Sequence, residues 1–194
     1  MGSDALFAPY EPRPQIGQRP TLPRALEIRS ARGDDLPGVA RLIVARDGGE
    51  HARHLDRLAM QLGRGEESEQ IVVASIDNEI VGYGRSTHFE PPEQSPPDTA
   101  PSGWYLAGLI VAPQHRRAGI GLALTQHRME QLSLRTRSVS CFASALNQAT
   151  IDLHAKLGFV ELTRRFIFPG VTFTGGAGIL FRADLRRFRP NARG

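Results

Sequence analysis

Two arginines and two glycines stand together in residues 114–121, QHRRAGIG, between an apolar segment and a helical pattern. The start of a helix presents free backbone N–H groups and a partial positive charge, and both attract anions. Gly119 and Gly121 would let a ligand approach the backbone closely, because no Cβ stands in the way. Arg116 and Arg117 add full positive charges at the same point. The stretch therefore predicts a cradle for a diphosphate.

Two common nucleotide motifs do not account for this stretch. A P-loop requires G-x-x-x-x-G-K-[ST], and the chain contains no Gly-Lys pair. The dinucleotide fingerprint G-x-G-x-x-G requires a third glycine where this chain has Leu124, and it normally follows the first strand of its fold. On its own, a G-x-G pair also fits a solvated basic helix start, so the motif needs support from elsewhere in the chain.

Hydrophobic periodicity defines the elements that must position this stretch. Apolar residues at i, i+3, i+4 and i+7 predict one helix from Leu36 and a second around Leu55. The full predicted order is a strand over 25–30, two helices, strands over 69–76, 79–89 and 104–111, a helix from 122, a buried strand over 138–146, a helix over 147–157, and a long strand, a glycine-rich turn and a last strand. This order predicts an α/β sheet with helices on both faces.

Length and composition fit one domain with short extensions. The 194 residues are 40% apolar, and we expect a proline-rich extension over 1–24, a domain over 25–185 and a basic tail over 186–194. The net charge of +4 and a pI near 10 favour anionic ligands but are mild beside those of nucleic-acid binders. No apolar run approaches the ~18 residues of a membrane span, and no secretory signal pattern is present, so we expect a cytoplasmic protein.

Two sequence motifs together resemble the GCN5-related N-acetyltransferases, the GNAT family. Residues 111–121 match its motif A, whose R/Q-x-x-G-x-G/A core is filled here by Arg116, Gly119 and Gly121. Residues 147–159, NQATIDLHAKLGF, match its second signature, with a predicted strand between the two motifs. The element order is also that of the family, and the resemblance covers roughly residues 25–183.

The resemblance implies a fold and a cosubstrate. The fold is a mixed, mostly antiparallel sheet of about seven strands flanked by about four helices, in which the parallel strands 104–111 and 138–145 splay apart. The cosubstrate is acetyl-CoA, with no metal, and its pantetheine arm inserts between the splayed strands. By position, the implied cofactor-binding residues are Leu109, Ile110, Val111, Arg116, Arg117, Ala118, Gly119, Ile120, Gly121, Leu122, Asn147 and His154.

The resemblance also implies a reaction, in which a primary amine attacks the thioester directly through a tetrahedral intermediate. The Leu109 backbone N–H is the implied oxyanion donor. Many family members place a general-acid tyrosine where this chain has His154, which leaves three roles open: acid, hydrogen bond to the cofactor, or packing. Some members carry a glutamate early in the strand before motif A, where this chain has Tyr105. No carboxylate lies within 104–111, so the general base stays unassigned.

The acceptor is the least specified part of the reaction. By the family's geometry the acceptor-side candidates are Glu50, His51, His54, Glu90 and Tyr105, and we expect the two histidines to be surface residues rather than metal ligands. A small-molecule amine is the first expectation, a protein amine the second and charged tRNA the third. A non-catalytic acyl-CoA-binding module is the competing class. We expect no nucleic-acid or membrane partner, and a homodimer is left open.

Overall fold

The computed structural model describes residues 22–173 and 176–188, so most of the expected N-terminal extension and basic tail lie outside the described residues. The described residues fall into two compact units. Unit 1 contains the described residues up to Arg85 together with Gly108–His127. Unit 2 contains Ser86–Ala107 and the described residues from Arg128 onward.

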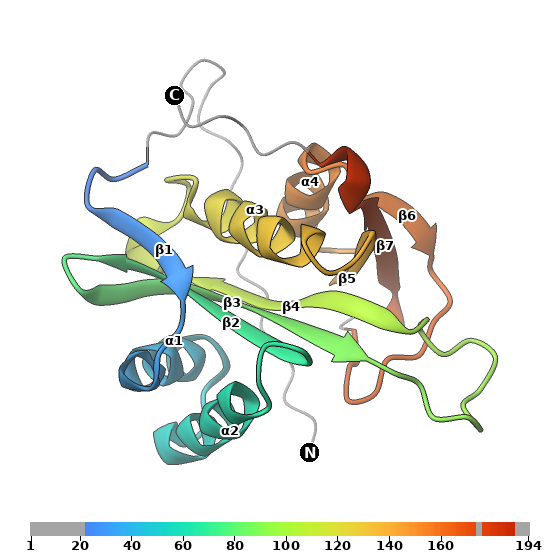
Figure 1. The fold of residues 1–194 in the computed structure, drawn as a ribbon, viewed down its shortest axis with the longest axis horizontal. Coiled ribbons are helices and arrows are strands. Elements are labelled where there is room, and N and C mark those ends of the chain that lie inside the picture. The colour runs from blue at the N-terminus through green and yellow to red at the C-terminus, as the bar shows by residue number, and fades with distance from the viewer. Residues whose placement is uncertain (1–21, 174–175, 189–194) are drawn as a thin grey trace. The chain divides into compact units, whose positions relative to one another are not determined.

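Unit 1 is a layered arrangement of helices and strands. Its elements are β1 (Leu26–Ser30), η1 (Gly33–Asp35), α1 (Leu36–Asp47), α2 (His51–Gly63), β2 (Glu69–Ile76), most of β3 (Glu79–Phe89), the end of β4 (Gly103–Val111), η2 (Pro113–His115) and the first half of α3 (Ile120–Ser133). β1 and β2 pair antiparallel, with Leu26 opposite Ile76. Figure 1 shows α1 and α2 side by side on one face of these strands.

The central strand of unit 1 is buried on both faces because its side chains alternate. Ile71 and Val73 of β2 pack with α1 and α2, whereas Val72 and Ala74 pack with Ile120 and neighbouring residues at the start of α3. A strand covered on both sides needs a continuous apolar run rather than an alternating one, and β2 has one. The start of α3 is thereby fixed against the sheet.

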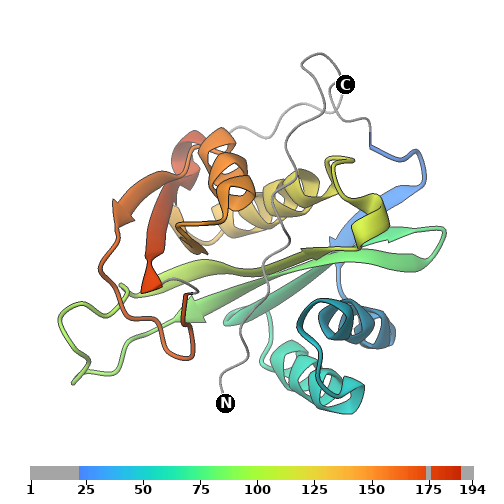
Figure 2. The same ribbon diagram turned by 180° about the vertical axis from the view of Figure 1, so that it is seen from behind.

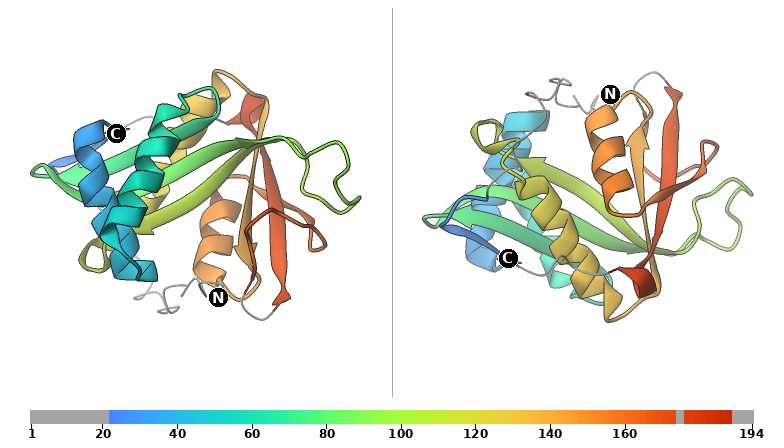
Figure 3. Two further views of the ribbon diagram at one scale, coloured as in Figure 1. Left: turned by 90° about the horizontal axis from the view of Figure 1, so that it is seen from below. Right: turned by 90° about the horizontal axis from the view of Figure 1, so that it is seen from above.

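Unit 2 contains the remaining strands and the fourth α-helix. Its elements are the beginning of β4, the end of α3, β5 (Ser138–Ser144), α4 (Gln148–Lys156), β6 (Val160–Thr163), β7 (Gly178–Asp184) and η4 (Leu185–Arg187). β5 and β7 pair antiparallel, from Ser138 opposite Asp184 to Ser144 opposite Gly178. α4 lies beside these strands (Figures 2 and 3). Met129, Cys141 and Phe181 are among the buried side chains of its core.

The strands within residues 22–173 and 176–188 form one seven-stranded sheet in the order β1-β2-β3-β4-β5-β7-β6. β4 and β5 are parallel, and the register between them is the single pair Tyr105 and Ser140, whereas β5 and β7 share seven pairs. The prediction of a mixed, mostly antiparallel sheet of about seven strands with a parallel pair and four α-helices is therefore confirmed. None of the helices in residues 22–173 and 176–188 is long and apolar enough to cross a membrane.

The long strand expected after Phe159 is shorter in the structure. β6 ends at Thr163, where an irregular register interrupts its pairing with β7. The following segment leaves the edge of the sheet and places Phe168 against Tyr105 and Phe142, with ring centroids 4.9 Å apart in both contacts. The apolar residues that suggested a continuing strand instead belong to an aromatic cluster in unit 2.

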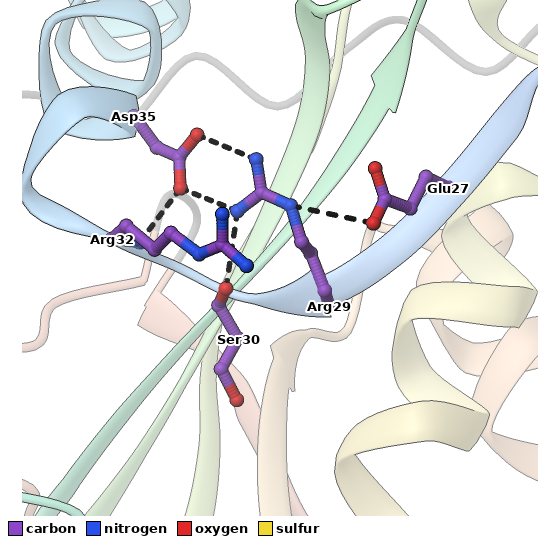
Figure 4. A network of polar contacts seen from close by, with 5 residues as sticks. All are labelled: Glu27, Arg29, Ser30, Arg32 and Asp35. Atoms are coloured by element: carbon purple, nitrogen blue, oxygen red, sulfur yellow. Dashed lines mark hydrogen bonds and ion pairs between the residues drawn. The ribbon is translucent and has the colours of Figure 1, made fainter.

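A charged network closes the junction between β1 and α1 (Figure 4). Asp35 accepts two hydrogen bonds from the Arg29 guanidinium, at 2.6 and 2.9 Å, and one from the Arg32 backbone N–H at 2.6 Å. Glu27 lies 3.6 Å from Arg29 on the other side. Asp35 precedes α1 without a side-chain capping bond to that helix, so its carboxylate serves the preceding strand and turn.

Candidate functional site

The predicted diphosphate cradle lies in unit 1 between β4 and α3. The chain leaves β4 at Ala112, whose N–H donates to Val81 O at 2.8 Å, so the loop is anchored to β3. Two residues of the loop are left-handed, Arg117 at φ +66° and Gly119 at φ +82°. Left-handed residues in a turn can curl successive N–H groups around an anion. α3 then begins at Ile120.

The first turn of α3 provides the donors that the sequence predicted. The Ala123 N–H donates to Gly119 O at 3.0 Å, so the N–H groups of residues 120–122 precede the first intrahelical bond. A Cβ on Gly121 would lie an ordinary 3.7 Å from the Leu109 side chain, so packing does not require glycine there. A bare backbone at Gly121 and exposed arginines at 116 and 117 fit a diphosphate.

A kink in β4 lies beside the predicted oxyanion donor. Gly108 adopts φ +72°, which only glycine takes readily, and it is exposed although Ala107 and Ile110 are buried. Leu109, directly after the kink, is half-buried. Solvent therefore reaches the backbone at the point where the resemblance places the acetyl carbonyl.

Sequence reasoning missed the side chains around this kink. Arg46 from the last turn of α1 places Nη1 3.5 Å from Leu109 O, and Tyr83 and Arg85 of β3 lie beside Gly108. The one available signal was Gly108 itself, because a glycine inside a strand pattern indicates a bulge or a close approach. The partners from α1 and β3 carry no local motif.

His154 lies inside unit 2 rather than at an open surface. Its ring is 5% exposed and donates from Nδ1 to Thr150 O at 2.8 Å, since a carbonyl oxygen can only accept. The ring also meets Phe159 edge-on at 5.0 Å and stacks with Phe181 at 6.5 Å. Burial lowers the pKa of His154 to about 4. At neutral pH the imidazole is uncharged, and its Nε2 can accept but not donate a hydrogen bond.

Asn147, the other cofactor candidate of unit 2, caps α4. Its Oδ1 accepts a hydrogen bond from the Thr150 N–H at 3.1 Å, which satisfies one of the free donors at that helix start. The amide group has two further N–H donors. Asn147 can therefore cap the helix and still contact a ligand.

Tyr105 and Glu90 lie in unit 2, in positions with local partners. Tyr105 is 1% exposed, and its hydroxyl donates to Pro101 O at 2.6 Å. Burial raises the pKa of Tyr105 to about 12. Glu90 accepts a hydrogen bond from the Ser102 hydroxyl at 2.5 Å. The structure thus gives Tyr105 a packing position, and Glu90 braces the loop between β3 and β4.

The remaining acceptor-side candidates hold the connection between α1 and α2 in unit 1. His51 Nε2 lies 3.1 Å from Pro37 O, and His54 Nε2 lies 2.9 Å from Gly48 O. Glu50 forms an exposed ion pair with Arg53 at 3.0 Å. Within the described part of the chain, no group of three or more His, Cys, Asp and Glu residues could hold a metal ion.

Comparisons with solved structures identify the fold. The ribosomal-protein-S18-alanine N-acetyltransferase of Escherichia coli shares 20% identity and a TM-score of 0.62, over 87% of this chain and 99% of that one. A putative acetyltransferase of Salmonella typhimurium, solved with acetyl-CoA, shares 18% identity and a TM-score of 0.64, over 88% and 100%. A phosphinothricin acetyltransferase of Sinorhizobium meliloti, also solved with acetyl-CoA, shares 16% identity and a TM-score of 0.62, over 87% and 94%.

Sequence comparison identifies the family. No curated protein sequence matches the chain. The acetyltransferase (GNAT) family model matches residues 35–159, which is well over half of the chain and includes both motifs. The chain therefore belongs to the GNAT family of N-acetyltransferases.

Proposed function

We propose that this protein binds acetyl-CoA through the start of α3 and transfers the acetyl group to a primary amine. The observation that carries the proposal is the α3 entrance, where left-handed Arg117 and Gly119 precede three helix N–H groups that lack intrahelical partners. The acetyl-CoA found in the Salmonella and Sinorhizobium structures supports it, because those chains share this fold.

Three regions of the chain would hold the cosubstrate. The N–H groups of residues 120–122 and the guanidinium groups of Arg116 and Arg117 would bind the diphosphate, whereas the Arg116 N–H donates to Pro113 O. The β4 backbone at residues 109–111 would hydrogen-bond the pantetheine arm, and by the resemblance Asn147 is a further candidate contact for the arm. The side chains of Ile120 and Leu124 pack against the sheet of unit 1, which keeps this helix start rigid.

Acetyl-CoA supplies a thioester that an uncharged amine can attack. The Leu109 N–H would stabilise the negative charge that develops on the carbonyl oxygen. The amine loses one proton and the departing sulfur gains one, so the reaction is balanced without a redox partner. His154 is neutral at pH 7 and its Nδ1–H is bound to Thr150 O. We therefore propose that His154 fixes α4 by packing and that solvent exchanges the two protons.

The acceptor is proposed to be a small-molecule amine, with a protein amine as the second candidate. The Sinorhizobium neighbour is named for a small molecule and the Escherichia coli neighbour for a protein alanine, so the fold accommodates both classes. At these identities the comparisons do not rank the two. The open kink at Gly108 is the feature of this chain on which a choice can be built.

Two measurements on the full chain test the proposal. Isothermal titration with acetyl-CoA should show one binding site, and a thiol-release assay should show CoA production that depends on added primary amine. Absence of acetyl-CoA binding would overturn the whole proposal. Binding without amine-dependent thiol release across a broad amine panel would instead support the non-catalytic acyl-CoA-binding module.

A further inference from the structure

The kink at Gly108 opens next to two polar side chains of β3. Gly108 is exposed between the buried residues Ala107 and Ile110. A Cβ built on Gly108 would lie 3.4 Å from the Tyr83 hydroxyl and 3.9 Å from the Arg85 Cβ. All five residues except Ala107 belong to unit 1. The hydroxyl and the arginine therefore border the stretch of β4 backbone that solvent reaches.

Two arginines are held near this backbone by carboxylates. Arg46 donates to both oxygens of Asp47, at 2.6 and 2.7 Å, and its Nη1 lies 3.5 Å from Leu109 O. Arg85 Nη1 lies 3.1 Å from both oxygens of Glu69, whose side chain is 3% exposed. The Arg46 and Arg85 side chains are 29% and 25% exposed. Both guanidinium groups are thus fixed in place and still touch solvent.

The surroundings of the Tyr83 hydroxyl carry an excess of positive charge. Burial raises the pKa of Tyr83, and the charges of Arg46, Arg85 and Arg57 oppose that rise. The carboxylate that adds to the rise is Asp47. With Glu69, which pairs with Arg85, the groups named are three cations and two anions, so one positive charge remains in excess. A positive region bordered by a phenol donor favours anionic groups and disfavours purely cationic ligands.

We infer that the acceptor is a small primary amine with an anionic group close to its nitrogen, a carboxylate or a phosphonate, which Arg46, Arg85 and the Tyr83 hydroxyl recognise. The inference rests on the proposed function, because it takes Leu109 as the point where the amine attacks. A polyamine or a lysine side chain would bring only positive charge to this region. The same field disfavours the ammonium form of a bound amine, and so favours the uncharged nucleophile.

Matched amines test the inference at saturating acetyl-CoA. The first comparison sets L-leucine, L-phenylalanine and L-methionine each against the corresponding decarboxylated amine. Leucine is also compared with leucinamide and with the aminophosphonate analogue of leucine. We expect kcat/KM for thiol release at least tenfold higher for the acids, with the phosphonate close to leucine. As competitive inhibitors of another acid's acetylation, the acids should also bind at least tenfold more tightly than the corresponding decarboxylated amines. Equal or better use of the amines that lack an acid group, of leucinamide or of peptides with a free N-terminus would overturn the inference.

Variants of unit 1 locate the recognition. Arg46→Gln and the pair Arg85→Gln with Glu69→Gln, which leaves no unpaired buried carboxylate, should each raise the acceptor KM about tenfold and reduce the preference for acids. Their affinity for acetyl-CoA should stay unchanged. Arg41→Gln, at an exposed position of α1, is the matched control. Tyr83→Phe should raise the KM of the acid substrates and leave the KM of amines without an acid group unchanged.

The outcomes separate this inference from the proposed function. If the wild-type protein binds no acetyl-CoA, the proposed function fails. If it acetylates amines without preferring acids, or if the arginine variants keep the wild-type preference, only the inference fails. Arg85→Lys with Glu69 unchanged is compared with the variant that carries Arg85→Gln and Glu69→Gln. If the lysine variant prefers acids and the glutamine variant does not, charge rather than folding carries the effect.

Discussion

α3 and α4 begin in opposite ways although each follows one of the two parallel strands. At α4, Asn147 Oδ1 accepts the Thr150 N–H, so the chain supplies its own cap. At α3, the preceding residue is Gly119, which has no side chain to offer and holds φ +82°. A side-chain N-cap from the chain itself stabilises a helix start. A helix start preceded by glycine has no such cap, so its N–H groups can bind a ligand.

The junction before α1 adds a third case. There the carboxylate of Asp35 is used by Arg29 and the Arg32 N–H, which ties the helix entry to β1. Among the described strand-to-helix junctions, the α4 entry is capped by a side chain, the α1 entry is tied to β1 by Asp35 without a cap, and the α3 entry combines glycine with exposed arginines. This difference predicts that changes at α3 affect ligand affinity, whereas changes at α1 and α4 affect stability.

Giving α3 a cap should produce the largest effect. Gly119→Asn introduces a residue that also tolerates the left-handed region, and its amide oxygen can accept hydrogen bonds from the N–H groups at the start of α3. We expect acetyl-CoA affinity to fall at least tenfold, and at least a hundredfold for the isosteric Gly119→Asp, whose charge repels the diphosphate. The melting temperature should stay within a few degrees, and titration calorimetry reads the affinity.

Gly65 provides the matched control for this change. It has φ +78° with nothing within 4 Å of an added Cβ, so Gly65→Asn and Gly65→Asp impose a similar backbone strain away from the cradle. Unchanged acetyl-CoA affinity in Gly119→Asp, or an equal loss in Gly65→Asp, would remove the distinction between the α3 and α4 entries.

His154→Phe tests whether α4 is structural throughout. The folded pKa of about 4 lies below the unfolded value near 6.5, so the unfolded state binds more protons between them. The free energy of unfolding is therefore at its full value above pH 6.5 and falls by about 3 kcal/mol as pH drops toward 4. The Phe variant should lack this loss in urea unfolding at several pH values. Its kcat at pH 8 should stay within about threefold of wild type.

A catalytic acid would behave differently. If His154 donated the proton to sulfur, the Phe variant would lose more than tenfold in kcat while acetyl-CoA affinity stayed the same. The wild-type pH profile of kcat would also show a titration that the variant lacks.

Asp35→Asn should weaken the α1 entry by about 2 kcal/mol, because it removes the charge from two hydrogen bonds with Arg29. The hydrogen bonds from Arg29 lower the pKa of Asp35 below its value in the unfolded chain. The charge of Asp35 therefore contributes fully to the free energy of unfolding at pH values above the unfolded pKa. The difference between wild type and variant should be constant from pH 5 to 8 and shrink below about pH 4. The neighbouring exposed Asp34 gives the control, Asp34→Asn, for which we expect no change in unfolding.

The ease of predicting these features from sequence depends on the range of the interactions behind them. The cradle was predicted from adjacent residues, Arg116 to Gly121, because a helix start and its glycines are local. The burial of His154 depends on Phe181, and the surroundings of Gly108 depend on Arg46, each distant in sequence. No local pattern encodes such partners, so the environment of His154 and the arginines of unit 1 were not predictable.

The element order was predictable for a similar reason. Apolar periodicity marked α1, α2 and α3, whereas β6 was predicted too long because Phe166 and Phe168 resemble strand residues until their tertiary contacts are seen. The cytoplasmic location and the domain bounds 1–24, 25–185 and 186–194 stay predictions, and the homodimer stays open.

Asn147 separates the two roles within one side chain and should give the smallest effect on stability. Asn147→Ala removes the cap and should cost about 1 kcal/mol in unfolding free energy. Asn147→Asp keeps an oxygen for the Thr150 N–H and should keep the stability, but it replaces the amide donors with a carboxylate. If the amide contacts pantetheine, Asp and Ala should both raise the KM for acetyl-CoA several-fold. If Asn147 only caps α4, Asp should match wild type in both measurements, and the binding site would then rest on unit 1.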